Sequence, residues 1–269
     1  MAKIGSYLLD SEVLIAFVLK KDRAWLLAHP EAAFSSRQKQ KFFSILNRRS
    51  KREPIAYIIE SKEFYGREFL VRPSVLIPRP DTEVLIETTV KLLARRTSPL
   101  SILDIGTGSG AIAVTLACET PVSVTAVDIS RSALSIARKN ASRHGMADVI
   151  QCKYANLFPK KATRYDVIIA NLPYLSSDEY RSAVKQYPEL QYEPYSALVA
   201  PEKGLALIEH LLRLSPNYLK TDGIIVLEIG SGQARAIRAF VKKYLPDYRA
   251  TFVRDLAKRI RVAVITQKN

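Results

Sequence analysis

The most informative stretch of this chain is Asp104-Ile-Gly-Thr-Gly-Ser-Gly-Ala111. The apolar residues 101–105 before the glycines predict a short buried strand, and residues 110–118 after them predict a buried helix. The alternating glycines permit a tight turn between the two elements and let a ligand approach the backbone closely. Backbone amides at the start of the helix then face that ligand. The stretch therefore indicates a ligand-binding turn in an α/β fold.

Strand-like and helix-like segments alternate on both sides of this turn. Strands are predicted at 101–105, 122–128, 148–153, 165–171, 222–229, 248–254 and 260–266. Helices are predicted at 110–118, 131–144, 203–219 and 232–244. The last two strands have no helix between them, so we expect them to pair as an antiparallel hairpin. The pattern predicts an α/β fold with a doubly wound, mostly parallel, seven-stranded sheet.

The segment before the sheet, residues 63–83, does not show the alternation of strands and helices. Alternating apolar residues around Gly66 predict a β-hairpin at 63–71. Two prolines exclude a regular helix through residues 78–80. We expect Asp81 or Thr82 to cap the helix that follows.

The first sixty residues are predicted to be helical. Apolar residues from Leu8 to Leu19 repeat at helical spacing, a second helix is expected to start near Ser35, and a short one follows Pro54. We place the domain boundary between about 60 and 80. Residues 1–75 would then form a small N-terminal α-helical domain with a hairpin linker, and residues 76–269 the sheet domain.

Composition narrows the class of protein. The chain has 269 residues, 48% hydrophobic and 25% charged, as in ordinary globular proteins. Two cysteines and three scattered histidines offer no metal-ligand cluster, so no metal site is expected. The longest stretch without a charged residue, Ile105 to Cys118, is too short to span a bilayer, and the first residues lack the basic flank of a secretory signal. We expect a cytoplasmic protein without a membrane partner.

The charge is high and uneven. The chain carries a formal net charge of +15, of which residues 1–80 contribute +7, residues 81–200 only +1, and residues 201–269 another +7. The basic flanks allow an anionic partner such as RNA, the ribosome or an acidic protein. A solvated basic surface without a partner is the alternative.

Two cofactors fit the glycine turn. Asp128 ends the next predicted strand, 22 residues after Gly106, where a carboxylate can accept hydrogen bonds from both hydroxyls of a ribose. With Ala111 in the last position, the turn also matches the dinucleotide-binding fingerprint. The acidic residue just before the glycines, Asp104, favours S-adenosylmethionine, whose ammonium group a carboxylate attracts. A glycine turn without a ligand would leave Asp128 without a role.

A second chemical motif is Asn171-Leu-Pro-Tyr174, which follows an apolar strand. Because ligands bind at the carboxyl ends of strands in doubly wound sheets, we expect this turn beside the glycine turn. The Asn171 side-chain oxygen and the Leu172 carbonyl can accept the two N–H protons of an amide or an exocyclic amine. Pro173 biases Leu172 toward an extended conformation, and the Tyr174 ring can pack on the planar group. A turn without a catalytic role is the alternative.

Together these motifs resemble the HemK/PrmC family, whose members methylate a glutamine side-chain amide in peptide chain release factors. The resemblance covers nearly the whole chain, and Ile77-Pro-Arg-Pro-Asp-Thr-Glu83 is highly specific to the family. Further similar segments are Glu53-Pro-Ile-Ala-Tyr57, Phe64-Tyr-Gly66, Glu193-Pro-Tyr-Ser-Ala-Leu198, Gly204-Leu205 and Glu228-Ile-Gly230. The resemblance implies an enzyme, a class I S-adenosylmethionine-dependent methyltransferase with a Rossmann-like sheet.

The resemblance also implies the site residues and the partner. S-Adenosylmethionine binding is implied for Asp104, Gly106, Thr107, Gly108, Ser109, Gly110, Asp128, Leu157 and Asn171. Asn171, Leu172, Pro173 and Tyr174 are implied to hold the substrate glutamine. The N-terminal domain would help to grip the release factor, whose Gly-Gly-Gln loop would enter the pocket. The basic flanks fit such docking.

Two positions depart from the family pattern. Leu172 stands where the family usually has proline, and Leu157 stands before Phe158 where an aromatic residue often packs on adenine. Asn-Leu-Pro-Tyr is also the form seen in ribosomal RNA adenine dimethyltransferases. Leu172 and the high positive charge therefore favour, as the main alternative, a ribosomal RNA or DNA adenine N6-methyltransferase. Two further alternatives are a non-catalytic ribosome-binding protein and a dehydrogenase.

Overall fold

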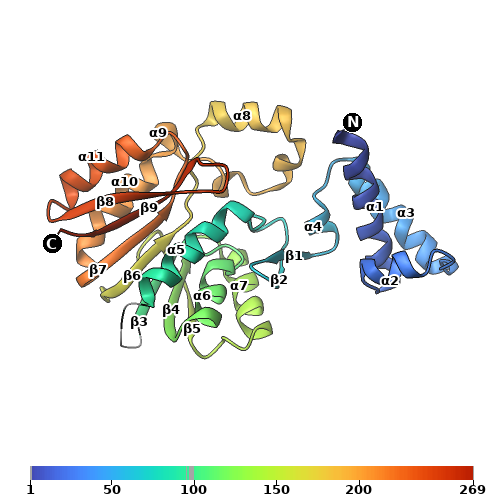
Figure 1. Ribbon diagram of the computed structural model, residues 1–269, viewed down its shortest axis with the longest axis horizontal. Helices are drawn as coiled ribbons and strands as arrows, with labels where there is room; N and C mark the ends of the chain where they lie inside the picture. The colour runs from blue at the N-terminus through green and yellow to red at the C-terminus, as the bar shows by residue number, and fades with distance from the viewer. Residues whose placement is uncertain (1, 95, 97–99, 269) are drawn as a thin grey trace.

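A seven-stranded sheet organises the larger part of the molecule in the computed structural model, which describes residues 2–94, 96 and 100–268 (Figure 1). Its strands are β3 (Leu100–Ile105), β4 (Val122–Asp128), β5 (Ile150–Tyr154), β6 (Tyr165–Ala170), β7 (Leu219–Glu228), β8 (Tyr248–Arg254) and β9 (Ile260–Gln267). The spatial order is β5-β4-β3-β6-β7-β9-β8, and among the described pairs the two that include β9 are antiparallel and the others are parallel. The predicted mostly parallel sheet and its C-terminal hairpin are confirmed.

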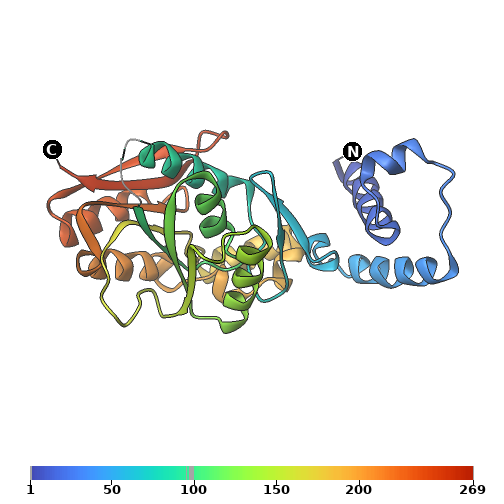
Figure 2. The same cartoon turned by 90° about the horizontal axis from the view of Figure 1, so that it is seen from below.

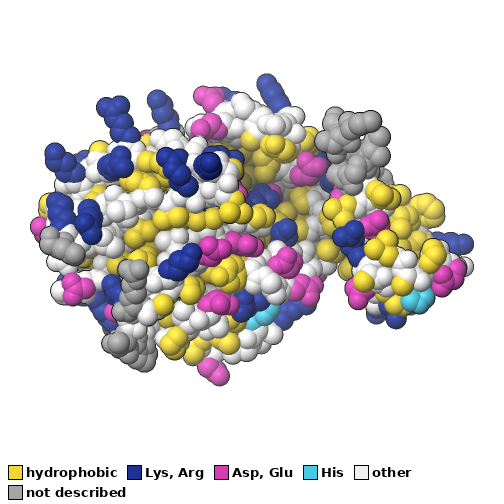
Figure 3. All heavy atoms as spheres, in the orientation of Figure 1, with side chains coloured by type: hydrophobic (Ala, Val, Ile, Leu, Met, Phe, Trp, Pro, Cys, Tyr) yellow, Lys and Arg dark blue, Asp and Glu magenta, His cyan; other side chains and the backbone are white. Residues whose placement is uncertain are grey.

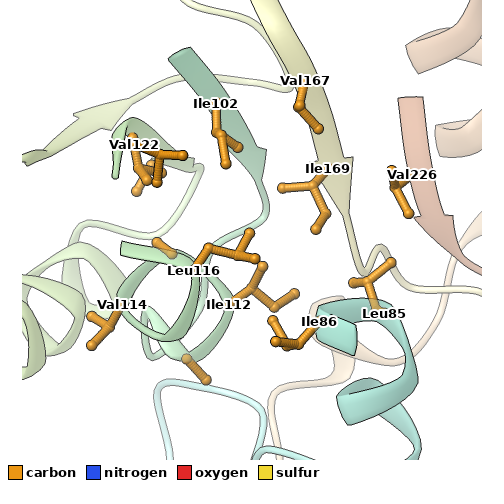
Figure 4. Packing of buried hydrophobic residues seen from close by; sticks show 14 of the residues in the cluster. Leu85, Ile86, Ile102, Ile112, Val114, Leu116, Val122, Val167, Ile169 and Val226 are labelled. Atoms are coloured by element: carbon orange, nitrogen blue, oxygen red, sulfur yellow. The ribbon is translucent and has the colours of Figure 1, made fainter. Parts of the chain in front are cut away.

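Helices cover both faces of this sheet (Figure 1). On one face lie α5 (Glu83–Leu93), α6 (Ala111–Glu119) and α7 (Arg131–Arg143); on the other lie α10 (Ala206–Leu214) and α11 (Ala234–Tyr244). Figure 4 shows Leu85 of α5 and Ile112 of α6 directed toward Ile102 and Ile169 of the central strands. The central strands are buried on both faces, which explains their nearly continuous apolar sequence. Within the described ranges, no helix combines the length and the apolar character needed to cross a membrane.

The N-terminal helices form a bundle at one end of the molecule (Figure 2). They are α1 (Ala2–Leu19), α2 (Arg23–Ala28), α3 (Ser36–Ser50) and α4 (Ile55–Ile58). Leu14, Val18, Ile45 and Ile58 form a core of their own. At the start of α3, the Ser35 side chain accepts from the Gln38 amide and the Gln38 side chain from the Ser35 amide, a capping box that stabilises the first turn. The predicted helical character is confirmed.

The predicted hairpin is also present, as β1 (Ser61–Phe64) and β2 (Arg67–Leu70). Its two-residue turn has positive φ at Tyr65 and Gly66, the geometry that tight hairpins favour. Phe64 and Phe69 are buried in the main core with α5 and α6. Because the hairpin packs on the sheet domain, the packing favours the N-terminal limit of the predicted boundary, which otherwise remains a prediction.

The predicted side-chain cap of α5 is wrong. Thr82 occupies the N-cap position, yet neither its side chain nor that of Asp81 caps the helix. The Thr82 hydroxyl instead donates to the Glu228 carboxylate at 2.6 Å, and Asp81 pairs with Arg261 at 2.9 Å. A 3-10 turn at Pro80–Thr82 leads into α5 and gives Thr82 helical φ and ψ of −70° and −18°, so its hydroxyl is not placed to cap the helix and is free for a partner from the far end of the chain.

The predicted helix at 203–219 is interrupted. A short helix α9 (Pro201–Gly204) comes first, with positive φ at Glu202 and Lys203, and α10 ends before a 3-10 turn at Ser215–Asn217. Residues 202–204 all have positive φ at the break, and at Gly204 the chain also passes close to another segment, because a Cβ there would lie 1.9 Å from the Tyr174 carbonyl oxygen. The chain must therefore turn at a glycine where it passes the Asn171–Tyr174 segment.

One described helix, α8 (Ser177–Gln186), lies in a part of the chain for which no helix was predicted. It buries no residue, and its only apolar residues are Tyr180, Ala183 and Val184, too few to identify it as a helix by apolar periodicity. Its capping box, formed by Ser176 and Glu179, was the available signal.

A carboxyl group lies in the centre of the sheet. Asp104 of β3 is 0% exposed, and neither carboxylate oxygen has a hydrogen-bond partner among the described residues. Burial, reinforced by the negative charge of Asp128, raises the pKa of Asp104 to about 7.

This pKa shift predicts a pH-dependent stability. In the unfolded chain Asp104 ionises near its ordinary pKa of about 3.9, so between that pH and about 7 the folded protein binds more protons. The free energy of unfolding should therefore fall as pH rises from about 5 to about 8, by at most about 3 kcal/mol from this group. Urea denaturation across this range should show a flatter pH profile for Asp104→Asn. Parallel profiles for the two proteins would show that Asp104 does not titrate this way.

Candidate active site

The register of four parallel strands places the two predicted motifs side by side. Ile105, at the end of β3, pairs with Val127 of β4 and with Ala170 of β6, and Ala170 pairs with Leu227 of β7. The residues that follow therefore form a row along the carboxyl edge of the sheet, in the order Asp128, Gly106, Asn171 and Glu228. The order of strands reverses between β3 and β6, which is where doubly wound sheets bind ligands.

Two cavities meet at the turn after β6. The smaller, of about 320 Å³, is lined on the side of the glycine turn by residues that include Gly106, Gly108, Asp128 and Leu157. The larger, of about 430 Å³, is lined by residues that include Pro54, Arg79, Tyr174, Glu193 and Glu228. Asn171, Leu172 and Pro173 line both cavities. Molecules that occupy the two cavities would therefore meet at this turn.

The glycine turn is held against its neighbours by its backbone. The amides of Gly106 and Thr107 both donate to the Val127 carbonyl at 2.9 Å. Gly106 has a φ of +74°, and a Cβ there would lie 3.2 Å from Leu172 Cδ2. Glycine is required because any side chain would be strained and would press on the turn that carries Asn171.

Asp128 lies in the smaller cavity with its carboxylate already oriented. Its Oδ2 accepts from the Gly108 amide at 2.9 Å and its Oδ1 from the Ser130 amide at 2.8 Å. Burial raises the pKa of Asp128, and these backbone hydrogen bonds oppose the rise. Each oxygen keeps a further lone pair, so the carboxylate can still accept two ligand hydroxyls, as a ribose requires.

The other residues implied for cofactor binding divide into two groups. Leu157 lines the smaller cavity, although it is only 6% exposed. The lining of the two cavities does not include Asp104, Thr107, Ser109 or Gly110, all of which are buried. The Ser109 carbonyl accepts from the Asn140 side chain at 2.8 Å. Direct cofactor contacts for this second group remain predictions.

The side chains of the Asn171–Tyr174 turn are connected to Glu228 through hydroxyl groups. Asn171 Nδ2 donates to Thr82 Oγ1 at 3.1 Å, and Thr82 Oγ1 donates to Glu228 Oε2 at 2.6 Å. Tyr174 OH donates to Glu228 Oε1 at 3.4 Å. Leu172 is buried against Gly106. The structure therefore brings together all four predicted residues of this turn and adds two polar residues beneath them.

Burial controls the ionisation of this cluster. It raises the pKa of Tyr174 to about 12, with help from the negative charge of Glu228, so the phenol is neutral at physiological pH. Burial also raises the pKa of Glu228, whereas the Thr82 hydrogen bond and the positive charge of Arg261 oppose that rise. Glu228 accepts one hydroxyl proton on each oxygen, the arrangement that an ionised carboxylate favours.

Several polar residues at this edge were not predicted as site residues. Thr82 and Glu228 support Asn171, as described above. Glu193 is buried beside the larger cavity, where it accepts from the Ile77 amide at 3.1 Å and pairs with Arg79. All of them lie in segments that resemble the HemK/PrmC family. For Glu228 a second signal was available, because it ends an apolar strand as Asp128 does.

Comparison with known proteins agrees with this geometry. Residues 1–59 match the family described as the PrmC N-terminal domain, and residues 102–190 match the family described as a methyltransferase domain. A methyltransferase structure from Pyrococcus furiosus superposes with a TM-score of 0.57 at 18% identity, covering 83% of this chain and 98% of that one. This likeness concerns the fold alone.

Proteins of similar sequence identify the family as well as the fold. A bifunctional methyltransferase of Rickettsia felis is 38% identical over 87% of this chain, and the chain spans about half of that protein, 49%. A release factor glutamine methyltransferase of Coxiella burnetii is 38% identical, and the match covers 95% of this chain and 90% of that protein. The chain therefore belongs to the family of release factor glutamine methyltransferases, as the resemblance of its motifs predicted.

Proposed function

We propose that this protein transfers a methyl group from S-adenosylmethionine to the side-chain amide nitrogen of the glutamine in the Gly-Gly-Gln loop of peptide chain release factors. The observation that carries the proposal is the meeting of two cavities at Asn171. One contains an oriented carboxylate for a ribose, and the other contains a turn suited to an amide. Membership of the release factor glutamine methyltransferase family supports the same reaction.

The smaller cavity fits the cofactor. Asp128 would accept the ribose hydroxyls, the backbone of the glycine turn would approach the methionine part, and Leu157 would pack on the adenine. Asp104, buried at the end of β3 just before the turn, would attract the ammonium group. When bound, S-adenosylmethionine supplies a methyl group activated by the positive charge on its sulfur.

The larger cavity would receive the glutamine. Asn171 Oδ1 and the Leu172 carbonyl would accept the two amide protons, and the Tyr174 ring would pack on the amide plane. An amide nitrogen is a weak nucleophile because its lone pair is delocalised, so the contribution of these residues is to align the nitrogen with the methyl carbon and the sulfur. After transfer the nitrogen loses one proton, which no strong base needs to remove in advance.

The outer parts of the molecule would bind the rest of the substrate. Arg49 of α3 pairs with Glu189, which lines the larger cavity, at 3.2 Å, so the helical bundle borders the opening. We assign the bundle a role in gripping the release factor. Figure 3 shows Lys and Arg side chains gathered over the region of α11 and β8. Exposed basic residues there include Arg235, Arg238, Lys242 and Lys243. This surface fits an association with the ribosome in the cytoplasm.

A methyl-transfer assay tests the reaction. Purified release factor and ribosomal RNA would be offered separately with isotopically labelled S-adenosylmethionine, and the label would be mapped by mass spectrometry. We expect the label on the glutamine of the Gly-Gly-Gln loop, and none when that glutamine is replaced by alanine. Label on adenine alone would refute the proposal. It would favour the alternative function of an RNA adenine methyltransferase, which Leu172 suggests.

Removing the amide acceptor should impair the chemical step. We expect Asn171→Ala to lower kcat about 100-fold to 1,000-fold, equivalent to about 2–4 kcal/mol, as for other groups that position a transition state. Its Kd for S-adenosylmethionine should change much less. The matched control is Asn217→Ala, an exposed asparagine in the 3-10 turn after α10, which should retain full activity. Near-normal turnover of Asn171→Ala would show that this turn is not the substrate site.

Removing the ribose acceptor should impair cofactor binding instead. We expect Asp128→Ala to raise the Kd for S-adenosylmethionine by about tenfold or more, a loss of roughly 1.4 kcal/mol, because two hydrogen bonds to the ribose are lost. Titration calorimetry would measure it, with the exposed Asp148→Ala as the control. An unchanged Kd would place the ribose elsewhere.

A further inference from the structure

We infer that Thr82 and Glu228 determine the direction of the Asn171 side-chain amide, so that its oxygen and not its nitrogen faces the substrate. The inference deepens the proposed function and rests on it. Thr82 and Glu228 are positioning residues in this account, because they act through Asn171.

The direction follows from the number of protons. Thr82 has one hydroxyl proton, and it is donated to Glu228 Oε2 at 2.6 Å. An ionised carboxylate only accepts, so this proton is committed. Thr82 Oγ1 can then offer Asn171 only a lone pair. The Asn171 group that faces Thr82 must therefore be the amide nitrogen, which donates at 3.1 Å.

The opposite end of the amide is left for a ligand. Asn171 Oδ1 forms no hydrogen bond with the residues that the structure describes, and Asn171 lines both cavities. A glutamine side chain presents an NH₂ group, which needs an acceptor at this place. With the amide reversed, Asn171 would present a donor to a donor, and its oxygen would face the lone pair of Thr82.

Burial of Thr82 and Glu228 prevents the Asn171 side-chain amide from adopting the reverse orientation. Thr82 is 4% exposed and Glu228 2% exposed, so water cannot supply the missing partners if Asn171 reverses. Glu228 is held in turn by Tyr174, whose hydroxyl donates to its second oxygen at 3.4 Å. The carboxylate therefore connects both ends of the Asn171–Tyr174 turn.

The position of Thr82 supports a role beyond helix stability. It lies where a 3-10 turn, Pro80–Thr82, leads into α5, and its helical φ and ψ of −70° and −18° are not those of a capping residue. Its side chain makes no capping hydrogen bond. The hydroxyl instead contacts a residue 146 positions away along the chain.

A comparison of Thr82→Val with Thr82→Ser tests the inference. Valine keeps the shape of threonine and removes the hydroxyl, whereas serine keeps the hydroxyl and removes the methyl group. We expect Thr82→Val to lower kcat for release factor methylation about tenfold or more, with KM for the release factor and Kd for S-adenosylmethionine within about twofold of wild type. Thr82→Ser should stay within about threefold of wild type in kcat.

The order of the two variants distinguishes positioning from packing. If Thr82 only fills space, serine is the more damaging change, and this order would overturn the inference, as would an unchanged kcat for Thr82→Val. Thermal denaturation would confirm folding. If Thr82→Val does not fold, Thr82→Ser and Thr82→Ala form the matched pair, because both lose the methyl group and only serine keeps the hydroxyl. The inference then requires the lower kcat in alanine, and equal values would overturn it.

A double-mutant cycle adds a second criterion. Because Thr82 acts through Asn171, Thr82→Val should cause no further loss of kcat in an Asn171→Ala background. A fully additive loss would overturn the inference. A wild-type protein that labels no release factor would overturn the proposed function and the inference together, whereas an active wild type with unimpaired Thr82→Val overturns the inference alone.

Discussion

Four parallel strands of the sheet end at the same register position, and the rest of this structure depends on that constraint. Because Val127, Ile105, Ala170 and Leu227 share one register line, the residues after them leave the sheet together. A shift of one residue in a single strand would direct its side chains to the opposite face. The burial of these strands on both faces makes such a shift costly. The hydrophobic core therefore sets the spacing of the polar site that lies above it.

Three buried or half-buried carboxyl groups lie at the carboxyl ends of these strands, next to the two cavities. Asp104 and Glu228 are almost inaccessible and Asp128 is half-buried, and burial raises the pKa of all three. Each is compensated differently. Backbone amides hold Asp128, hydroxyl groups and the charge of Arg261 support Glu228, and Asp104 lies without a described hydrogen-bond partner. These carboxyl groups suit the edge of the sheet to polar ligands, and their burial lowers the stability of the sheet.

The helical bundle is joined to the sheet domain by both apolar and polar contacts. Tyr57 of α4 packs with Val75 and with Ile136 of α7, and Arg49 bridges Asp10 within the bundle to Glu189 beside the larger cavity. The Tyr192 hydroxyl donates to the Lys51 carbonyl at 2.6 Å. Partly exposed ion pairs contribute only about 0–1 kcal/mol each. Such an interface positions the bundle at the opening of the site without making it part of the main core.

The amino-acid sequence by itself determined the elements and the two motif turns. Apolar periodicity specified the alternating strands and helices, and the glycines with Asp128 and the Asn171–Tyr174 segment marked the edge of the sheet that would carry the site. Tertiary structure decided the rest. Thr82, which the sequence alone suggests as a helix cap, becomes the partner of Glu228, and at the break in the predicted helix the Tyr174 carbonyl leaves room only for a glycine at position 204. Periodicity is a property of neighbouring residues, whereas these hydrogen bonds and close contacts join residues about 30 to 146 positions apart, and only the folded chain brings them together.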